Sequence, residues 1–238
     1  MTVTALVVQN TPTGGPGRWE RWLYEGGLTL EVVHGYAGDP LPERLRPRYQ
    51  ALVVLGGGYL PDDDARAPWL ARTRELAGEA LEFGLPVFGI CLGGQLLAQV
   101  GGGAVRGEHG RPEVGDVELT LRQEAADDPL FTGLPSRPHA IENHVDAITA
   151  LPPGATWLAS TEGCPYQAFR LGGSAWGVQF HPEAAADRIA HWDPDRLARL
   201  GADRDTLHRD ALAADAAAAA VWQKVALRFA HHAATTAA

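Results

Sequence analysis

Cys91 stands in the segment PVFGICLGGQ (residues 86–95), where a short apolar run ends and a helical stretch begins. Gly89 and Gly93, two residues before and after the cysteine, allow the close chain approach that a sharp strand-to-helix turn requires. The pattern predicts a nucleophile elbow that presents the thiol at the end of a strand. It also places the thiol at the positive end of a helix dipole, which favours the thiolate, the nucleophilic form of cysteine.

A base for this nucleophile is predicted in His181-Pro182-Glu183, which follows the apolar run 175–180. A nucleophile needs a base, and the base needs a group that orients it. Side chains two residues apart in an extended chain point to the same side, so Glu183 is expected to hold the ring of His181. The predicted triad is Cys91 as nucleophile, His181 as general base and then acid, and Glu183 as orienting carboxylate.

Two segments, PVFGICLGGQ and later QFHPE (residues 179–183), resemble the class I, or triad, glutamine amidotransferases. The layout of the whole chain is most similar to free-standing relatives of the glutaminase domain of GMP synthase. The resemblance implies hydrolysis of the glutamine side-chain amide through a γ-glutamyl thioester, with the ammonia passed to an acceptor and no cofactor. We expect no synthetase domain in this chain, so the resemblance implies L-glutamine as substrate and, as partner, a separate synthetase subunit.

The same resemblance implies roles for residues around the triad. The backbone N–H groups of Gly57 and Leu92 would form the oxyanion hole, where one donor contributes roughly 2.7 to 4 kcal/mol of transition-state stabilisation. Gln95 would contact the substrate glutamine. Asn143 and His144 would line the pocket for its α-amino and α-carboxylate groups.

Two departures from the family pattern leave other functions open. Gly58 replaces a frequent proline, and Val145 follows Asn143-His144 where relatives commonly have glycine. Because a β-branched residue rarely takes a positive φ, Val145 predicts an altered α-carboxylate pocket. An alternative is therefore a γ-glutamyl peptidase or hydrolase that acts on a larger substrate without a partner. A non-enzymatic alternative is a regulatory binding module with an inactive site, against which the intact triad argues.

Acidic and histidine side chains elsewhere do not predict a metal site. Glu142, His144 and Asp146 alternate and would share one face of an extended segment, but three ligands from one short strand suit a tetrahedral ion poorly. Cys164 is expected to be a small buried apolar residue. The glycine run 56–58 lacks the Lys-Ser/Thr of a phosphate loop and precedes three aspartates. We expect neither a metal ion nor a bound phosphate.

Short apolar runs bounded by Gly or Pro alternate with helical stretches in the first half of the chain. This alternation predicts a single α/β domain over residues 1–238, with a doubly wound, mainly parallel central sheet, helices on both faces and a site at the carboxyl ends of the strands. The strands are expected at 5–8, 28–33, 51–55 and 85–89, the helices at 18–25 and 66–83, further mixed or antiparallel strands of the same sheet at 117–121, 166–171 and 175–180, and a docked amphipathic helix at 209–232.

Composition excludes several classes of protein. Of 238 residues, 45% are hydrophobic and 21% charged, which is typical of a globular chain with a sizeable core. The net charge of -9, without a basic run, argues against nucleic acid and anionic membranes as partners. The uncharged stretch 83–105 is broken by Pro and Gly, so we expect no membrane span there. Two cysteines and a first segment without basic residues favour a cytoplasmic protein.

Overall fold

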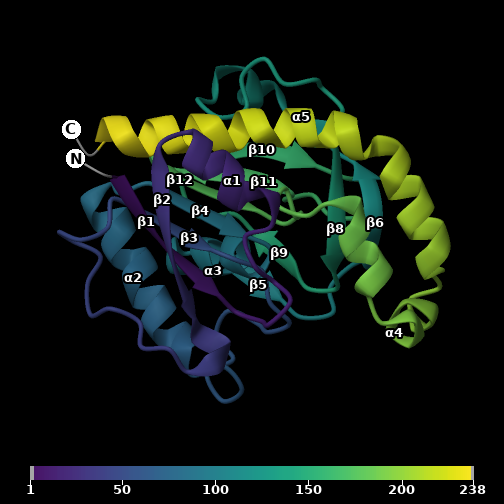
Figure 1. Ribbon diagram of the computed structural model, residues 1–238, viewed down its shortest axis with the longest axis horizontal. Helices are drawn as coiled ribbons and strands as arrows, with labels where there is room; N and C mark the ends of the chain where they lie inside the picture. The colour runs from purple at the N-terminus through teal and green to yellow at the C-terminus, as the bar shows by residue number, and fades with distance from the viewer. Residues whose placement is uncertain (1–2, 237–238) are drawn as a thin grey trace.

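An eight-stranded sheet forms the centre of the protein, seen in a computed structural model that describes residues 3–236 (Figure 1). The strand order is β2-β1-β3-β4-β12-β11-β10-β7. The strands are β1 (Val3–Gln9), β2 (Leu28–His34), β3 (Ala51–Val54), β4 (Val87–Ile90), β7 (Thr120–Leu121), β10 (Thr156–Ser160), β11 (Ala168–Leu171) and β12 (Ala175–Val178).

The first five strands of this order pair in parallel, and β11, β10 and β7 extend the sheet antiparallel. Parallel strands have both faces covered, which explains why β3 and β4 are buried along their whole length and contain few polar side chains. The predicted doubly wound α/β fold with a mainly parallel sheet is confirmed. The predicted helix at 66–83 begins later, at Trp69, because Pro68 precedes its first turn.

Two apolar layers pack on opposite faces of the sheet. Side chains alternate along β1, so that Ala5 and Val7 belong to one layer and Leu6 and Val8 to the other. The first layer is covered by α1 and α5, and the second by α2 and α3. The helices are α1 (Arg18–Glu25), α2 (Trp69–Phe83), α3 (Leu92–Val100), the short α4 (Pro194–Arg199) and α5 (Arg204–Thr236).

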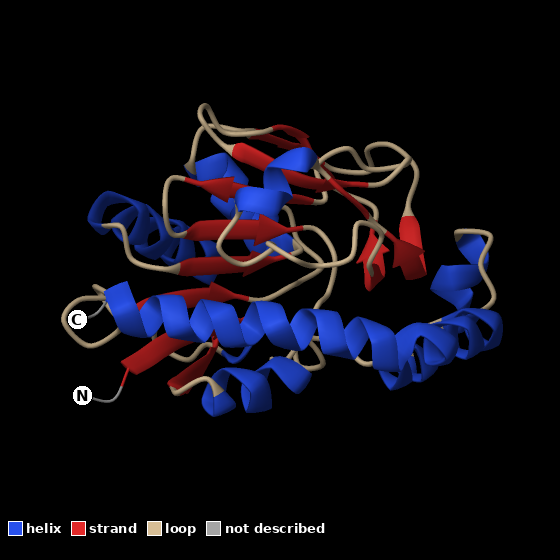
Figure 2. Cartoon of the chain, turned by 90° about the horizontal axis from the view of Figure 1, so that it is seen from above, coloured by secondary structure: helices blue, strands red, loops and turns tan. Residues whose placement is uncertain are grey.

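The helix α5 runs past one whole side of the sheet (Figure 2). It spans 33 residues and so extends the predicted helix 209–232 at both ends. Phe229 anchors it, with ring centroids 5.6 Å from Phe88 of β4 and 6.3 Å from Trp176 of β12. Further toward its start, α5 contacts β6 and β8, so one helix packs on the central sheet and on the smaller sheet described next.

Two small sheets lie beside the central one. β6 (Glu113–Glu118) pairs with β8 (His139–His144), and β5 (Ala104–Arg106) pairs with β9 (Ala147–Ala150). The prediction of one strand of the central sheet at 117–121 is therefore wrong in part. Residues up to Glu118 belong to β6, and only Thr120 and Leu121 reach the central sheet as β7. The chain changes sheets at Leu119, whose side chain is fully buried.

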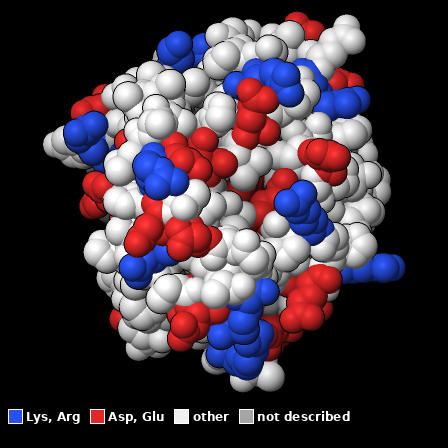
Figure 3. Space-filling view, turned by 90° about the vertical axis from the view of Figure 1, so that its right-hand side faces the viewer, with Lys and Arg blue, Asp and Glu red and all other residues white. Residues whose placement is uncertain are grey.

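Three 3₁₀ helices complete the described part of the fold, at Gly35–Ala37, Gln123–Asp127 and Ala186–His191. Within residues 3–236, none of the helices combines the length and the apolar character that crossing a bilayer demands. Lys and Arg side chains are interspersed with Asp and Glu over the face that carries β6, β8 and α4 (Figure 3).

Candidate active site

Cys91 occupies the tight turn between β4 and α3. Its backbone has φ 51° and ψ −108°, a conformation that is strained for a residue with a side chain. A Cβ on Gly89 would collide with the carbonyl of Gly93, and a Cβ on Gly93 would collide with the carbonyl of Val54. The backbone N–H of Cys91 donates to Val178 of β12 at 2.8 Å. The predicted sharp turn from strand to helix at Cys91 is confirmed, and the sheet holds it in place.

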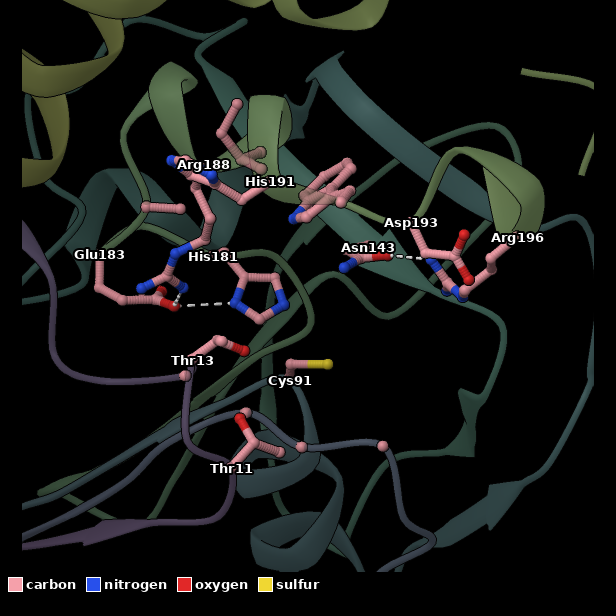
Figure 4. Close-up of a pocket in the computed structure, with 17 residues that line it drawn as sticks. Thr11, Thr13, Cys91, Asn143, His181, Glu183, Arg188, His191, Asp193 and Arg196 are labelled. Atoms are coloured by element: carbon pink, nitrogen blue, oxygen red, sulfur yellow. Dashed lines mark hydrogen bonds and ion pairs between the residues drawn. The ribbon is translucent and has the colours of Figure 1, made fainter. Parts of the chain in front are cut away.

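His181 and Glu183 lie in the loop after β12 and face each other (Figure 4). Nδ1 of His181 and Oε1 of Glu183 are 2.9 Å apart, and both side chains are nearly buried. The backbone N–H of His181 donates to the carbonyl of Ile141 in β8 at 2.8 Å, which fixes the loop against the small sheet. Since Glu183 holds Nδ1, the second ring nitrogen of His181 remains available for proton transfer.

Arg188 completes this charged group. Its Nη1 donates to the same oxygen of Glu183 at 2.8 Å, and its Nη2 donates to the carbonyl of Gly15 at 3.1 Å. Arg188 comes from the 3₁₀ helix 186–191, and the linear sequence gives no sign of this contact. It adds a positive charge to a carboxylate that would otherwise be buried beside the histidine alone.

Burial and charge act in opposite directions on the His181–Glu183 pair. Burial favours the neutral imidazole, but the charge of Glu183 and hydrogen bonds with Cys91 and Glu183 outweigh it and raise the pKa of His181 well above its ordinary value. Burial also favours the neutral carboxyl, but the charges of His181 and Arg188 outweigh it and lower the pKa of Glu183. The pair is therefore arranged to hold a proton on the ring and a negative charge on the carboxylate.

Gln179, in the same QFHPE segment, is a residue of the site that reasoning from the sequence missed. Its Nε2 donates to the sulfur of Cys91 at 3.6 Å. Nε2 of Gln95 donates to Oε1 of Gln179 at 3.1 Å and to the carbonyl of Asp146 at 3.2 Å. Gln95 is only 2% exposed and does not belong to the cavity wall. The structure thus places Gln95 where it orients Gln179, one side chain away from the sulfur.

A cavity of about 400 Å³ opens above Cys91. Its floor lies at the carboxyl ends of parallel strands, where open α/β sheets bind ligands. It is lined by residues that follow β1, β3, β4 and β12, together with β8 and α4: Thr11, Thr13, Gly14, Gly56, Gly57, Gly58, Cys91, Ile141, Asn143, His181, Glu183, Ala184, Arg188, His191, Trp192, Asp193 and Arg196.

One of the two predicted oxyanion donors belongs to the cavity wall. Gly57 lines it, and Leu92 is the first residue of α3, so its backbone N–H has no acceptor within the helix. Asn143 also lines the cavity, where its Oδ1 accepts from Nη1 of Arg196 at 2.7 Å (Figure 4). His144, in contrast, is 5% exposed and lies on the other side of β8.

Val145 shows no backbone strain. Among the non-glycine residues of the described chain, positive φ occurs at Cys91 and Glu108 only, so Val145 keeps an ordinary backbone conformation. Its carbonyl accepts from the N–H of His109 at 3.0 Å. The segment thus accommodates the β-branched residue without a positive φ.

Sequence comparison identifies relatives of this chain. Residues 20–191 match the family model described as glutamine amidotransferase class-I. A glutamine-hydrolyzing GMP synthase from Aeropyrum pernix is 39% identical over 163 residues, which are 68% of this chain and 30% of that protein. A subunit of the glutamine-hydrolyzing GMP synthase from Thermococcus kodakarensis is 43% identical over 106 residues, 44% of this chain and 54% of the relative. The matches thus span about a third to a half of these relatives.

A solved structure extends the likeness to the whole fold. The glutamine amidotransferase from Thermotoga maritima superposes with a TM-score of 0.85 at 25% identity, covering 97% of this chain and 99% of that one. The family match includes the elbow at Cys91 and the His181–Glu183 pair. The chain therefore belongs to the class-I glutamine amidotransferase family.

Proposed function

We propose that Cys91, His181 and Glu183 hydrolyse the side-chain amide of L-glutamine and release ammonia for a separate acceptor. The observation that carries the proposal is the convergence of an elbow cysteine and a carboxylate-held histidine on one cavity. Family membership supports glutamine as the amide donor.

In the first half-reaction, Sγ of Cys91 attacks the amide carbon of glutamine. The N–H groups of Gly57 and Leu92 bind the oxyanion that forms, and each such donor contributes roughly 2.7 to 4 kcal/mol. The protonated ring of His181 gives its proton to the amide nitrogen, the C–N bond breaks and ammonia leaves. The enzyme now holds a γ-glutamyl thioester, and His181 is neutral.

In the second half-reaction, His181 acts as a base. It takes a proton from a water molecule, whose oxygen attacks the thioester carbon, and the C–S bond breaks to release glutamate and the thiolate. Glu183 and Arg188 keep the imidazole ring in place throughout, because the carboxylate stays on Nδ1 and the guanidinium holds the carboxylate. Gln179 and Gln95 position the sulfur.

We propose that the ammonia is used by a synthetase on a separate polypeptide chain. The support is the similarity to the Thermococcus protein, which is named as one subunit of a GMP synthase. The unpaired state of both Cys91 and Cys164 supports a reducing compartment such as the cytoplasm.

Glutamate release from L-glutamine and from a γ-glutamyl dipeptide tests the proposal, with the Cys91→Ala variant as the blank. We expect glutamine turnover that the variant lacks, and an increase when the cognate synthetase and its acceptor are added. Fast Cys91-dependent turnover of the dipeptide with little turnover of glutamine would overturn the proposal in favour of a γ-glutamyl peptidase. Equal rates in wild type and variant would overturn the assignment of the nucleophile.

A further inference from the structure

A second group of reactive side chains lies behind the active site, on the far side of β8. Along this strand, Ile141 and Asn143 line the cavity, while Glu142 and His144 are buried on the opposite side. Glu113 of β6 and Cys164, between β10 and β11, reach the same place. The ligand atoms of Glu113, His144 and Cys164 all lie within 4.8 Å of one another.

The ring of His144 is held in the orientation that metal-bound histidines show. Its Nδ1 lies 2.9 Å from the carbonyl oxygen of Asp146, which only accepts, so Nδ1 carries the hydrogen. Nε2 then lies 3.1 Å from Oε2 of Glu113 and 3.6 Å from Oε2 of Glu142. In a neutral ring, the lone pair of Nε2 faces two carboxyl oxygens that also carry lone pairs. Because these groups repel one another, a positive charge is required between Nε2 and the oxygens. Metal-bound histidines commonly donate their other N–H to a backbone carbonyl.

Glu142 is the independent observation that points to a ligand. Its side chain is 0% exposed, and neither carboxyl oxygen has a hydrogen-bond partner. An unpartnered buried carboxylate is strongly unfavourable unless it binds a proton or a cation. Gln167 does not relieve it, because its amide nitrogen donates to Glu113 at 2.7 Å and its oxygen also has no partner.

We propose that Glu113, Glu142, His144 and Cys164 bind one divalent transition-metal ion of the zinc class. One imidazole, one thiolate and two carboxylates form a set of four donors that suits a tetrahedral zinc site. Bonds of about 2.0 to 2.3 Å place tetrahedral ligands about 3.3 to 3.7 Å apart. The 3.1 and 3.6 Å separations around Nε2 are close to that range. Binding displaces the Cys164 thiol proton to solvent as the metal–sulfur bond forms.

This site differs from the arrangement of Glu142, His144 and Asp146 along one extended segment that was considered from the sequence. Three ligands from one short strand would surround a tetrahedral ion poorly. In the structure Asp146 contributes only its backbone carbonyl to His144, and the remaining ligands come from two other segments. The four donors belong to β6, β8 and the β10–β11 connection, so three separate segments contribute to the site.

The ion would have a structural role toward the active site. It ties the small sheet, whose strand β8 presents Asn143 to the cavity, to a loop of the central sheet. Gln167 links the two sites, since its side-chain amide donates to Glu113 and its backbone carbonyl accepts from the backbone N–H of Gln179 at 2.8 Å. Gln179 in turn contacts Cys91. The metal thus supports one wall of the cavity and takes no part in the reaction.

Cobalt(II) titration of the full chain tests the proposal, in a Cys91→Ala background so that Cys164 is the single thiol. We expect one Co²⁺ per chain, visible bands of tetrahedral cobalt and a thiolate-to-cobalt charge-transfer band, all displaced by Zn²⁺. The further substitution Cys164→Ala should remove the charge-transfer band. Absence of binding in the Cys91→Ala chain, or cobalt binding to it without a thiolate charge-transfer band, would overturn the proposal.

Glu142→Gln provides a test if the Cys164 variant does not fold. It keeps the side-chain shape and removes one anionic ligand. Mutation of a residue that only contacts a metal ligand lowers affinity roughly 10- to 100-fold, so we expect the loss of Zn²⁺ affinity in Glu142→Gln to be larger than that. Chelation should lower the thermal midpoint of the unsubstituted chain but leave that of Glu142→Gln unchanged. If both chains bind zinc equally, or if chelator alters neither, a proton on Glu142 or His144 occupies the position instead and the proposal fails.

Discussion

Gln179 donates its side-chain amide to the sulfur of Cys91 at 3.6 Å. We predict that Gln179→Leu lowers kcat for glutamine hydrolysis roughly tenfold to a hundredfold, because hydrogen bonds to charged groups contribute about 1.5 to 3 kcal/mol. Alkylation of Cys91 by iodoacetamide should slow in parallel, since the same contact orients the sulfur that reacts. Gln223→Leu, on the exposed side of α5, serves as the control. Unchanged kcat and alkylation in Gln179→Leu would contradict the role assigned to this contact.

The His181–Glu183 pair predicts a pH-dependent contribution to stability. Glu183 has a lowered pKa, so its contribution is complete above about 4.5 and is lost as the pH falls through the lowered value. His181 has a raised pKa, so its contribution is complete below about 6.5 and is lost as the pH rises through the raised value. The pair therefore stabilises the fold most between about pH 4.5 and 6.5.

Urea unfolding of Glu183→Gln over a pH series measures this effect. In that window we expect a loss on the order of 3 kcal/mol in the free energy of unfolding, because a partly buried guanidinium and an imidazolium lose their carboxylate. The difference from wild type should shrink in stronger acid. Glu124→Gln, at an exposed carboxylate, is the matched control and should change little at any pH. A difference that stays constant from acid to neutral pH would contradict the coupling.

Arg196 is predicted to bind the α-carboxylate of the substrate. It lines the cavity and orients Asn143 through a 2.7 Å hydrogen bond. Its guanidinium has further N–H donors, arranged so that two of them can bind both oxygens of a carboxylate. Arg196→Gln should raise KM for glutamine roughly tenfold or more with little change in kcat, because the contact is the same in ground and transition states. Arg199→Gln, exposed on the same helix, is the control. A fall in kcat at constant KM would instead place Arg196 in the chemical step.

Gly93 and Gly78 are helical glycines with opposite predicted responses to alanine. A Cβ at Gly93 meets the backbone of Val54, so Gly93→Ala should displace the elbow and abolish turnover. The protein should also be destabilised by several kcal/mol, as it is when a core is overpacked. A Cβ at Gly78 has its nearest neighbour at 4.0 Å. Gly78→Ala should therefore stabilise by up to about 1 kcal/mol. Thermal unfolding and glutaminase assays of both variants separate the two cases.

The catalytic elements of this protein were predictable because their signals are local. Buried parallel strands appear as continuous apolar runs, and the elbow depends on glycines within two residues of Cys91. The split of 117–121 between two sheets was not predictable, since alternation of side chains does not say which sheet a strand joins. The predicted burial of Cys164 is confirmed, because this residue is 1% exposed.

Contacts made by distant segments carry no local signal. Arg188 reaches Glu183 because a 3₁₀ helix turns back over the site, and Arg196 reaches Asn143 across the cavity. The nearness of Glu113, His144 and Cys164 likewise arises only when β6, β8 and the β10–β11 connection pack together. Gln179 lies within a recognised motif, and its hydrogen bond to Cys91 could have been suspected from the strand that ends at His181.

The long helix α5 has a consequence for how the protein folds during synthesis. Phe229, near its end, packs on Phe88, so the central sheet keeps an uncovered apolar face until the last segment of the described chain has been made. Contacts between residues so far apart in sequence form slowly, since a long loop must close first. A nascent chain that lacks α5 therefore exposes an aggregation-prone surface, and a chaperone that binds apolar segments is expected to retain it until the ribosome releases the helix.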